Sequence, residues 1–385
     1  MAKPYTFKMK LKHLAVACIM KMFGILPKSP NKIVFCSYFG KGYGDNGKAI
    51  TEALLKINPN LDIVWGVSSQ FMASLPDTVR GVEYNSLKYL KELATAVAWV
   101  DNSRKNAGVR KRKGQFYVQT WHGTVALKQI ENDAACNLDE FYVAGAKNDS
   151  KMADVILSGC KFFTDLCKRS FWYNGEILEC GSPRSDALFN TDNTKKSEVK
   201  KALGIPDGKK IILYAPTFRA DEQLECYNMD FNAVLDALEK KTGDSWVFAV
   251  RLHPNVCEKA DFITYSDRIF NATVYNDLYE LIPTVDFVIS DYSSVMFDAA
   301  LVDKPVMLFA TDVKEYIADR NFYFDIRKLP FGLAESNDEL INNIKTFDRD
   351  KYDICVKEFN SKVGYFENGT AAKAVAERIM TEIND

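Results

Sequence analysis

Residues 289–298 read Ile289-Ser-Asp-Tyr-Ser-Ser-Val-Met-Phe-Asp298 and pass from an apolar strand into a helix. The strand pattern ends at Ser290, and the helix starts near Ser293 or Ser294. A helix start presents free backbone N–H groups and a positive dipole end, which suit a phosphate. Asp298 lies one helical turn beyond Ser294 on the same face, a position suited to a ribose or polyol hydroxyl. The same residues also fit a plain helix cap followed by a solvated aspartate.

Outward from this run, strand-like and helix-like segments alternate along the chain. The alternation predicts an α/β protein with two doubly wound parallel sheets, each covered by helices, in two domains that face a cleft. The expected strands are 32–39, 62–67, 96–102, 116–120, 177–179, 211–215, 247–250, 285–290 and 306–309. The expected helices are 46–58, 86–95, 231–241, 277–282 and 294–302.

Composition divides the chain of 385 residues into three parts. Residues 1–28 form a basic, apolar segment that is expected to lie as an amphipathic helix on an anionic membrane, or else to pack on the core. Residues 29–188 and 205–385 form the N-terminal and C-terminal domains, joined by the polar, lysine-rich stretch 189–210. The helical tail 369–383 can fold back onto the first domain.

Charge is distributed unevenly although the formal net charge is only −1. The first 44 residues contain lysines and no acid, and residues 102–130 again contain cations and no acid. An anionic surface is therefore the expected partner, and no nucleic acid is expected. The basic run 104–113 fits either a solvated loop or a segment that attracts phosphate or lipid. The apolar stretch 14–26 is shorter than the about 20 residues that span a bilayer. Lys21 also interrupts the apolar run that a signal peptide would need.

Cysteine and metal-ligand patterns give no sign of a disulfide framework or a metal site. The chain has nine cysteines, an odd number, with no CxxC spacing, which is typical of reduced thiols in a cytosolic protein. It contains no HExxH, DxD or paired-histidine spacing. We therefore expect no metal and no cofactor.

Two of the three histidines each follow an apolar, β-rich run. His122 follows residues 115–120, and His253 follows residues 246–250. The carboxyl ends of strands in an open α/β sheet border the crevice where ligands bind, and histidine moves protons near neutral pH. The two residues are therefore candidate catalytic groups, although a buried, hydrogen-bonded core histidine fits the same pattern. His13 has no such setting.

Three arginines also follow strand-like runs, in the motifs that contain Arg184, Arg219 and Arg251. One such arginine is typical of a surface ion pair, but three of them favour the binding of a polyanionic substrate. Gly123 and Thr124, next to His122, are expected to add the free N–H groups of a further helix start.

These motifs, in this order, resemble the CDP-glycerol glycerophosphotransferase family, whose members prime and polymerise wall teichoic acids. The resemblance covers most of the chain and implies a GT-B-like fold of two Rossmann-type domains, a CDP-activated polyol phosphate donor and a membrane-borne acceptor. Val125-Ala126 stands where the family usually has Pro-Leu. The motifs are Lys32-Ile-Val-Phe35, Asp45-Asn46, Gln119-Thr-Trp-His-Gly-Thr124, Gly181-Ser-Pro-Arg184, Tyr214-Ala-Pro-Thr-Phe-Arg219, Arg251-Leu-His-Pro254, Ser290-Asp-Tyr-Ser-Ser-Val-Met-Phe-Asp298 and Lys304-Pro305.

The resemblance also implies roles. Glycerol phosphate would move from CDP-glycerol to a lipid-linked glycan or polyol-phosphate acceptor, with release of CMP, at the cytoplasmic face of the membrane. Residues 29–188 would bind the acceptor and residues 205–385 the donor. His122 and His253 match the catalytic histidines; we take His122 as the general base, although the two roles are interchangeable at this point. The residues that match the donor site are Gly123, Thr124, Arg184, Pro216, Thr217, Arg251, Ser293, Ser294 and Asp298.

Several alternatives stay open at the level of sequence. The donor could instead be CDP-ribitol. A GT-B nucleotide-sugar glycosyltransferase or a UDP-sugar 2-epimerase would share the architecture. An inactive, membrane-bound assembly partner would share the fold without the chemistry. The length of the chain favours a primase-like or single-addition enzyme, and it leaves the oligomeric state open.

Overall fold

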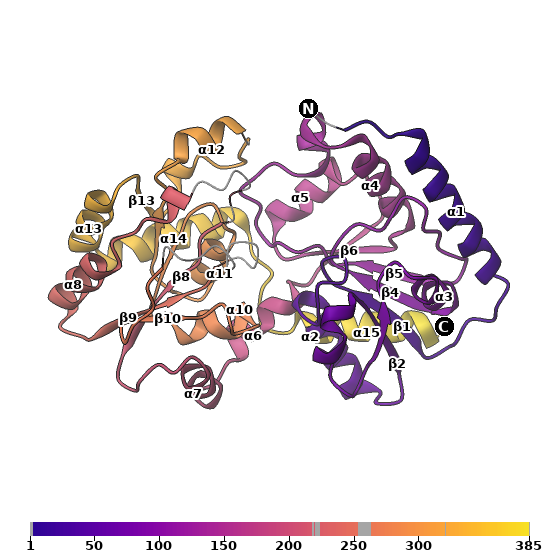
Figure 1. Ribbon diagram of the computed structural model, residues 1–385, viewed down its shortest axis with the longest axis horizontal. Coiled ribbons are helices and arrows are strands. Elements are labelled where there is room, and N and C mark those ends of the chain that lie inside the picture. Colours follow the sequence, from indigo (N-terminus) through magenta and orange to yellow (C-terminus); the bar gives the residue numbers. More distant parts are fainter. Residues whose placement is uncertain (1–2, 218, 220–223, 253–262, 320, 385) are drawn as a thin grey trace. The chain divides into compact units, whose positions relative to one another are not determined.

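The computed structural model describes residues 3–217, 219, 224–252, 263–319 and 321–384, and it divides into two compact units (Figure 1). The N-terminal unit contains Met1–Thr124, Ile130–Asp186 and Tyr365–Asp385. The C-terminal unit contains Val125–Gln129 and Ala187–Gly364. The final segment of the chain thus belongs to the same unit as its beginning.

The N-terminal unit is built on a sheet of seven parallel strands in the order β3-β2-β1-β4-β5-β6-β7. Because β2 and β4 lie on opposite sides of β1, the carboxyl ends of β1 and β4 form a topological switch point, where open α/β sheets bind ligands. The strands are β1 (Lys32–Cys36), β2 (Asp62–Val67), β3 (Arg80–Glu83), β4 (Ala98–Asp101), β5 (Phe116–Gln119), β6 (Val155–Ser158) and β7 (Glu176–Glu179).

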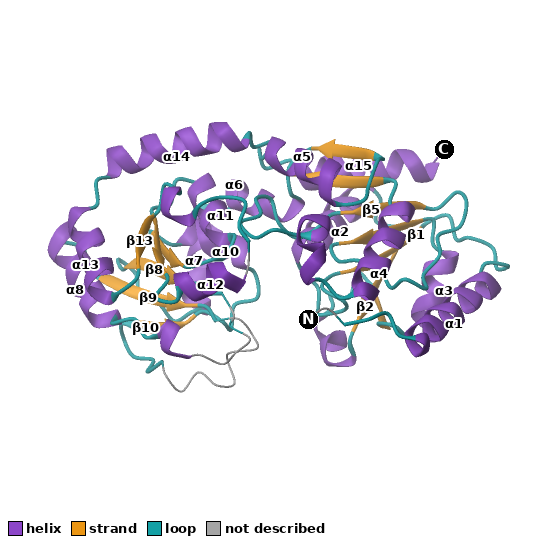
Figure 2. Cartoon of the chain, turned by 90° about the horizontal axis from the view of Figure 1, so that it is seen from above, coloured by secondary structure: helices purple, strands orange, loops and turns teal. Residues whose placement is uncertain are grey.

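Helices cover both faces of this sheet (Figure 2). Successive residues of β1 point to opposite faces, so Phe35 packs with Leu54 and Ile379 on one side while Val34 packs with Leu93 on the other. Burial on both faces explains why the inner strands β1 and β2 are apolar after their first residue, whereas the edge strands β3 and β7 carry exposed charged residues. The helices are α1 (Phe7–Phe23), α2 (Asp45–Ile57), α3 (Leu87–Thr95), α4 (Glu140–Met152), α5 (Lys161–Ser170) and α15 (Ala371–Asn384), with 3-10 helices η1 (Ser69–Ser74), η2 (Glu131–Asn137) and η3 (Pro183–Ser185).

The C-terminal unit has a sheet of six parallel strands in the order β10-β9-β8-β11-β12-β13. Its switch point lies between the carboxyl ends of β8 and β11, since β9 and β11 lie on opposite sides of β8. The strands are β8 (Lys210–Tyr214), β9 (Trp246–Val250), β10 (Ile269–Asn271), β11 (Phe287–Ser290), β12 (Val306–Phe309) and β13 (Gly332–Ala334).

Helices also enclose this second sheet, and α8 and α13 pack on the face that carries Ile212 and Phe248. The helices are α6 (Asp186–Asn190), α7 (Asn193–Ala202), α8 (Phe231–Thr242), α10 (Leu278–Leu281), α11 (Val295–Leu301), α12 (Val313–Asp319), α13 (Asn337–Thr346) and α14 (Arg349–Val363), with 3-10 helices η4 (Leu224–Tyr227), η5 (Ile282–Thr284) and η6 (Ile326–Lys328).

Helix α1 packs against α3 through Met20, which is buried. Its opposite side keeps large apolar side chains in solvent, including Phe7 (76% exposed), Leu14 (60%) and, just past the helix, Ile25 (85%). The basic segment therefore forms a helix that packs on the core with one side and exposes apolar side chains on the other. Among the helices that the structure describes, none has the length and apolar character needed to cross a bilayer.

The α/β prediction is confirmed, and two strands, β2 and β12, have the predicted bounds. The first strand is shorter than the predicted 32–39, because it ends at Cys36. Tyr38 and Phe39 have φ angles of 45° and 59°, which turn the chain away from the sheet. This turn carries the chain across the switch point of the first sheet.

Candidate active site

The switch point of the N-terminal unit gathers polar groups around Asn102, the first residue after β4. The Asn102 amide donates to Asp45 Oδ1 over 2.9 Å, and its side-chain oxygen accepts the Tyr38 backbone N–H over 2.8 Å. The backbone carbonyl oxygen of Asn102 lies 2.7 Å from Nδ1 of His122. A loop from each of β1, β4 and β5 thus meets at one residue.

The contact with Asn102 fixes the hydrogen position on His122. A carbonyl oxygen can only accept, so Nδ1 must carry the hydrogen, and neutral His122 has its lone pair on Nε2. Burial lowers the pKa of His122, although the Asn102 carbonyl and the Asp45 charge oppose this effect. The ring also stacks on Trp121, with ring centroids 4.3 Å apart. The side chain is therefore a neutral, oriented imidazole near pH 7, as a general base must be.

The backbone around His122 is strained. Tyr38, Asp45 and Trp121 have φ angles of 45°, 58° and 53°, in the left-handed region that non-glycine residues rarely occupy. Such conformations persist only where the surrounding structure enforces them, and they cluster at functional sites. Their concentration around one histidine supports a functional role for this edge of the sheet.

Arg184, a predicted donor-site residue, is buried in this same cluster. Its Nη1 atom lies 2.7 Å from Asp45 Oδ2, and its backbone N–H donates to Asn46 Oδ1. Burial opposes the charged form of Asp45, but Arg184 and Asn102 hold the pKa of that carboxyl below its usual value. Arg184 thus contacts a protein carboxylate that in turn holds Asn102.

Gly123 and Thr124 follow His122 directly. Thr124 is buried, and its hydroxyl forms a hydrogen bond of 2.8 Å with the Ser182 hydroxyl and donates to Glu367. A Cβ atom added to Gly123 would meet nothing within 4 Å, so packing does not require a glycine there. The expected helix start at these residues is wrong, because the next helical element, η2, begins only at Glu131.

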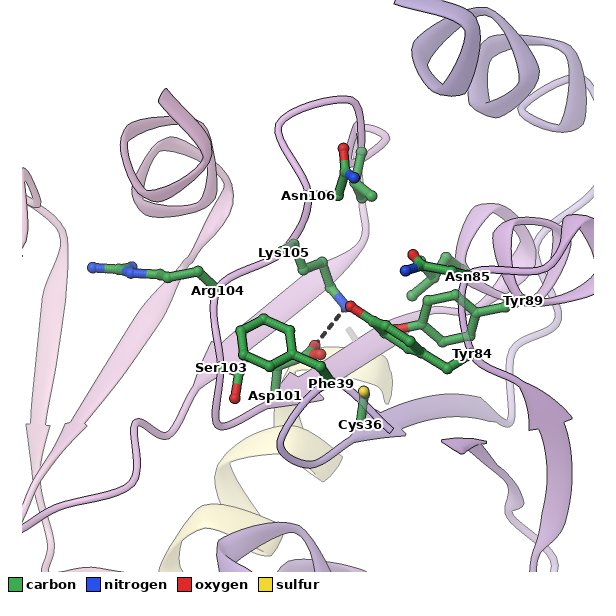
Figure 3. Close-up of a pocket in the computed structure, with 12 residues that line it drawn as sticks. Cys36, Phe39, Tyr84, Asn85, Tyr89, Asp101, Ser103, Arg104, Lys105 and Asn106 are labelled. Carbon is green, nitrogen blue, oxygen red and sulfur yellow. Dashed lines mark hydrogen bonds and ion pairs between the residues drawn. The ribbon is translucent and has the colours of Figure 1, made fainter. Parts of the chain in front are cut away.

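The basic run 104–113 is neither a solvated loop nor a free cationic surface at its start. Arg104 is buried against Glu131 and Asp149, at 2.8 and 3.1 Å. Figure 3 shows Lys105 directed at Asp101, from which its ammonium nitrogen lies 2.7 Å away, in a pocket bordered by the ring of Tyr89. These cations stabilise the loop that carries Asn102 and Ser103.

The switch point of the C-terminal unit contains a buried ionic cluster. Arg219 lies 2.9 Å from Asp291 and 2.7 Å from Asp312, and its guanidinium packs over the Tyr292 ring. Asp291 also accepts the backbone N–H of Thr217 over 2.8 Å. The turn after β8 and the loop after β11 are therefore joined through one aspartate.

The predicted residues Pro216, Thr217, Ser293 and Ser294 lie on these two loops. Pro216 is buried, whereas Thr217, Ser293 and Ser294 are partly exposed, although the hydroxyl oxygen of Thr217 is itself buried. Ser294 immediately precedes α11. The structure thus brings these four residues to one edge of the second sheet.

Asp298 and Arg251 are each engaged by the protein. Asp298 is buried and accepts the Tyr279 hydroxyl over 2.9 Å. Arg251 donates to the backbone carbonyls of Ala272 and Asn276 over 3.3 and 3.1 Å. Arg251 therefore supports the loop after β10, and Asp298 joins α11 to α10. His253, the second predicted catalytic residue, lies outside the described residues.

Sequence reasoning did not single out Asn102 and Asp291 as parts of the sites. Both directly follow an apolar strand that borders a switch point. A polar residue at that position of each strand was the signal that could have identified them. Within the described residues, no cluster of three or more histidine, cysteine or acidic side chains is arranged to hold a metal ion.

Known proteins resemble this chain along most of its length. A teichoic acid glycerol-phosphate transferase of Staphylococcus aureus is 32% identical over 391 residues, which cover 97% of this chain and 99% of the relative. A teichoic acid poly(glycerol phosphate) polymerase of Staphylococcus epidermidis is 31% identical over 370 residues, which cover 92% of this chain and 51% of the relative. The chain thus spans about half the length of that polymerase.

A solved structure of a variant of the wall teichoic acid polymerase TagF with CDPG has the same fold. Its TM-score is 0.81 at 28% identity, and the match covers 98% of this chain and 97% of that chain. The family model described as CDP-glycerol:poly(glycerophosphate) glycerophosphotransferase matches residues 18–381. This match covers most of the sequence and both units. The chain therefore belongs to the CDP-glycerol:poly(glycerophosphate) glycerophosphotransferase family.

Proposed function

We propose that this chain transfers glycerol phosphate from CDP-glycerol to a hydroxyl of a lipid-linked glycan or polyol-phosphate acceptor and releases CMP. The reaction would take place at the cytoplasmic face of the membrane, in the synthesis of teichoic acid or a related surface polymer. Family membership, the names of the two relatives and the TagF structure with CDPG support this proposal. No metal or cofactor is part of it.

The observation that carries the proposal is the orientation of His122. Its Nδ1 atom is held by the Asn102 carbonyl, so Nε2 is the atom that accepts the proton of the acceptor hydroxyl. The acceptor oxygen forms a bond to the β-phosphorus of CDP-glycerol. The bond from that phosphorus to the bridging oxygen breaks, and CMP leaves with the electron pair. Positioning and charge stabilisation supply most of the catalysis in such transfers.

The C-terminal unit would bind the donor. In this proposal Ser293 and Ser294 contact phosphate oxygens, and His253 stabilises the pyrophosphate and the leaving CMP. Arg251 takes part by holding the loop after β10, and Asp298 by joining α11 to α10, since both already bond to protein groups. The partly exposed residues Ser293 and Ser294 on the loop after β11 support this assignment.

Helix α1 would bring the chain to an anionic membrane. At about 100° per residue, Phe7, Leu11, Leu14, Cys18 and Met22 fall on one stripe, and all five are exposed. Exposed lysines flank the stripe on both sides, at positions 8, 10, 12 and 21. An apolar stripe between lysines is typical of a helix that lies in the interface of an anionic bilayer.

The reaction is tested by CMP release from CDP-glycerol and, in parallel, from CDP-ribitol, with a membrane extract as acceptor. We expect CMP from CDP-glycerol, and a loss of about 10²- to 10⁴-fold in kcat for His122→Asn, which removes the base. His13→Gln is the matched control, because His13 contacts Tyr5 and lies on α1, outside the two switch points and outside the apolar stripe. CMP from CDP-ribitol alone would change the donor assignment, and no CMP from either donor would contradict the proposal.

Membrane contact is tested by sedimentation with phosphatidylglycerol and phosphatidylcholine vesicles. We expect binding to the anionic vesicles only, and its loss in the double variant Phe7→Ser/Leu14→Ser. The double variant Ile57→Ser/Leu87→Ser removes exposed apolar side chains elsewhere and should bind normally. Equal binding by the wild type and both double variants would contradict the proposal that α1 contacts the membrane.

A further inference from the structure

A continuous chain of hydrogen bonds runs behind His122, on the side of Nδ1. Arg184 donates to Asp45 Oδ2, Asp45 Oδ1 accepts the Asn102 amide, and the Asn102 carbonyl accepts from His122 Nδ1. The Tyr38 hydroxyl also donates to Asp45 Oδ2 over 2.9 Å. The reaction proposed above uses the Asn102 carbonyl but assigns no role to Asp45 or Tyr38.

We propose that Asp45 is a positioning residue. It is held by Arg184 and Tyr38 and in turn holds the Asn102 side chain, so that the backbone carbonyl of Asn102 keeps His122 in the Nδ1–H tautomer. This inference rests on the proposed function, because it specifies how the proposed base is held. It assigns Arg184 to the support of His122 and not to the donor phosphates.

The contacts of Asp45 favour positioning over substrate binding. Each of its oxygens accepts at least one hydrogen bond from the protein, and the side chain is only 6% exposed. Asn102 is equally occupied, since its side-chain oxygen accepts from the Tyr38 N–H and the Ser103 hydroxyl. Neither side chain is placed to bind a polyol or a nucleotide.

The backbone supports the same conclusion. Asp45 begins α2 with a φ of 58°, and Tyr38 has a φ of 45°. A buried ion pair that served stability alone would not require a strained backbone at Asp45 and at Tyr38, which donates to it, because the strain itself costs free energy. These conformations instead bring the Tyr38 backbone N–H and the Asp45 carboxylate to the Asn102 side chain.

Charged groups on several elements act on His122, and they predict shifts of opposite sign. Asp45 and Glu131 raise the pKa of His122, and Arg184 lowers it. Arg104 packs over Trp121, on which the His122 ring stacks. Removal of the Asp45 charge should therefore lower the pKa of His122, and removal of the Arg184 charge should raise it.

The first experiment measures the pH dependence of CMP release. For Asp45→Asn we expect a 10- to 100-fold lower kcat, an unchanged KM for the donor and an acid limb at lower pH. For Arg184→Gln the acid limb should move to higher pH. Tyr38→Phe removes one bond to Asp45 without a change of charge, so it tests the network even if a charge variant fails to fold. It should lower kcat less than Asp45→Asn does.

The second experiment needs no substrate. The chain has only three histidines, so the imidazole ¹⁵N signals of His122 can be assigned by single substitution. We expect the Nδ1–H tautomer in the wild type and a mixture of tautomers in Asp45→Asn. Asp186→Asn is the control: Asp186 accepts the Ala371 and Ala372 N–H groups, and its loss weakens the same unit without a contact to His122.

The two readouts separate the two proposals. If folded Asp45→Asn and Tyr38→Phe keep the wild-type tautomer, kcat and acid limb, Asp45 has no positioning role. If the wild type releases no CMP but its tautomer is fixed and becomes mixed in Asp45→Asn, the positioning inference stands and the proposed function fails. If Asp186→Asn also mixes the tautomers, the effect is general destabilisation and the inference is overturned.

Discussion

The carboxyl edges of the two sheets are built differently, although both units share the doubly wound topology. In the N-terminal unit one arginine and one aspartate support a carbonyl that holds His122. In the C-terminal unit Arg219 joins two aspartates and links two loops that carry hydroxyls. The first edge orients a single imidazole, and the second joins two loops. In the proposed function, the same topology thus serves a proton acceptor in one unit and a binding surface in the other.

The distribution of strain follows this difference. Among the described residues, Tyr38, Asp45 and Trp121 at the first edge have positive φ angles, whereas Asp303 is the non-glycine residue of the C-terminal unit that does. Asp303 lies after α11 and away from the loops that follow β8 and β11. Orientation of one ring therefore requires an enforced backbone, and a hydroxyl-lined platform does not.

The largest expected contrast concerns the two buried arginines. Arg219→Met removes the cationic partner of both Asp291 and Asp312, whereas Arg184→Met removes the cationic partner of Asp45 alone. Arg219→Met should therefore lower the free energy of unfolding by more. Breaking a buried pair costs about 3–5 kcal/mol, and we place Arg219 at the upper end and Arg184 at the lower. The measurement is the free energy of unfolding in urea. Arg268→Met is the control, since that pair is partly exposed and should cost about 1 kcal/mol or less. Equal losses for Arg184 and Arg219 would contradict the contrast.

A smaller contrast is expected in the pH dependence of stability. Burial raises the pKa of Asp101 to about 6, above its value of about 3.9 in the unfolded chain. Its contribution is therefore fully present below about pH 3.9 and is lost as the pH rises through 6. For Asp312 burial opposes the charge, but Arg219 lowers the pKa, so its contribution is present above about pH 3.9 and is lost at lower pH.

Unfolding of Asp101→Asn and Asp312→Asn between pH 3 and 7 measures this contrast. As the pH falls, the wild type should gain stability relative to Asp101→Asn and lose it relative to Asp312→Asn. Hydrogen exchange of peptides from β4 and α12 reports the stability of the N-terminal and C-terminal units separately. Parallel trends for the two variants would show that the two edges respond alike.

The smallest expected effect is the loss of a helix N-cap, which should lower the free energy of unfolding equally in the two units. Ser86 caps α3 by accepting the Tyr89 N–H, and Asp230 caps α8 by accepting the Ala233 N–H. Ser86→Ala and Asp230→Ala should each cost about 1 kcal/mol. Similar losses in urea denaturation would confine the difference between the units to their edges, and unequal losses would extend it to the helices that cover the sheets.

Much of the fold could be predicted from the sequence because its strands are buried on both faces. Segments such as 62–67 and 306–309 are continuous apolar runs with clear ends, and the structure places strands there. Strands β10 and β13 have only three residues each, too few for a periodic pattern. The sequence therefore predicts the alternation of strands and helices better than the strands at the sheet edges.

The site was less predictable, because its contacts join residues far apart in the chain. Asp45 meets Asn102 across 57 positions and Arg184 across 139. Arg104 meets Glu131 across 27 positions, so a basic run that seemed solvated or anion-binding is internally paired. Strand ends could place His122 at a crevice, but its partners emerge only once the order of the strands is known.

The return of α15 to the N-terminal unit has a consequence for synthesis of the chain on the ribosome. Val375, Ala376 and Ile379 belong to the same buried cluster as Phe35 and Trp65. Until residues 371–384 have been translated, α2 covers only part of that face of the first sheet, although all of its strands already exist. The C-terminal unit, whose residues end at Gly364, can finish folding first. The nascent first half must therefore be protected from aggregation for as long as the second half takes to translate.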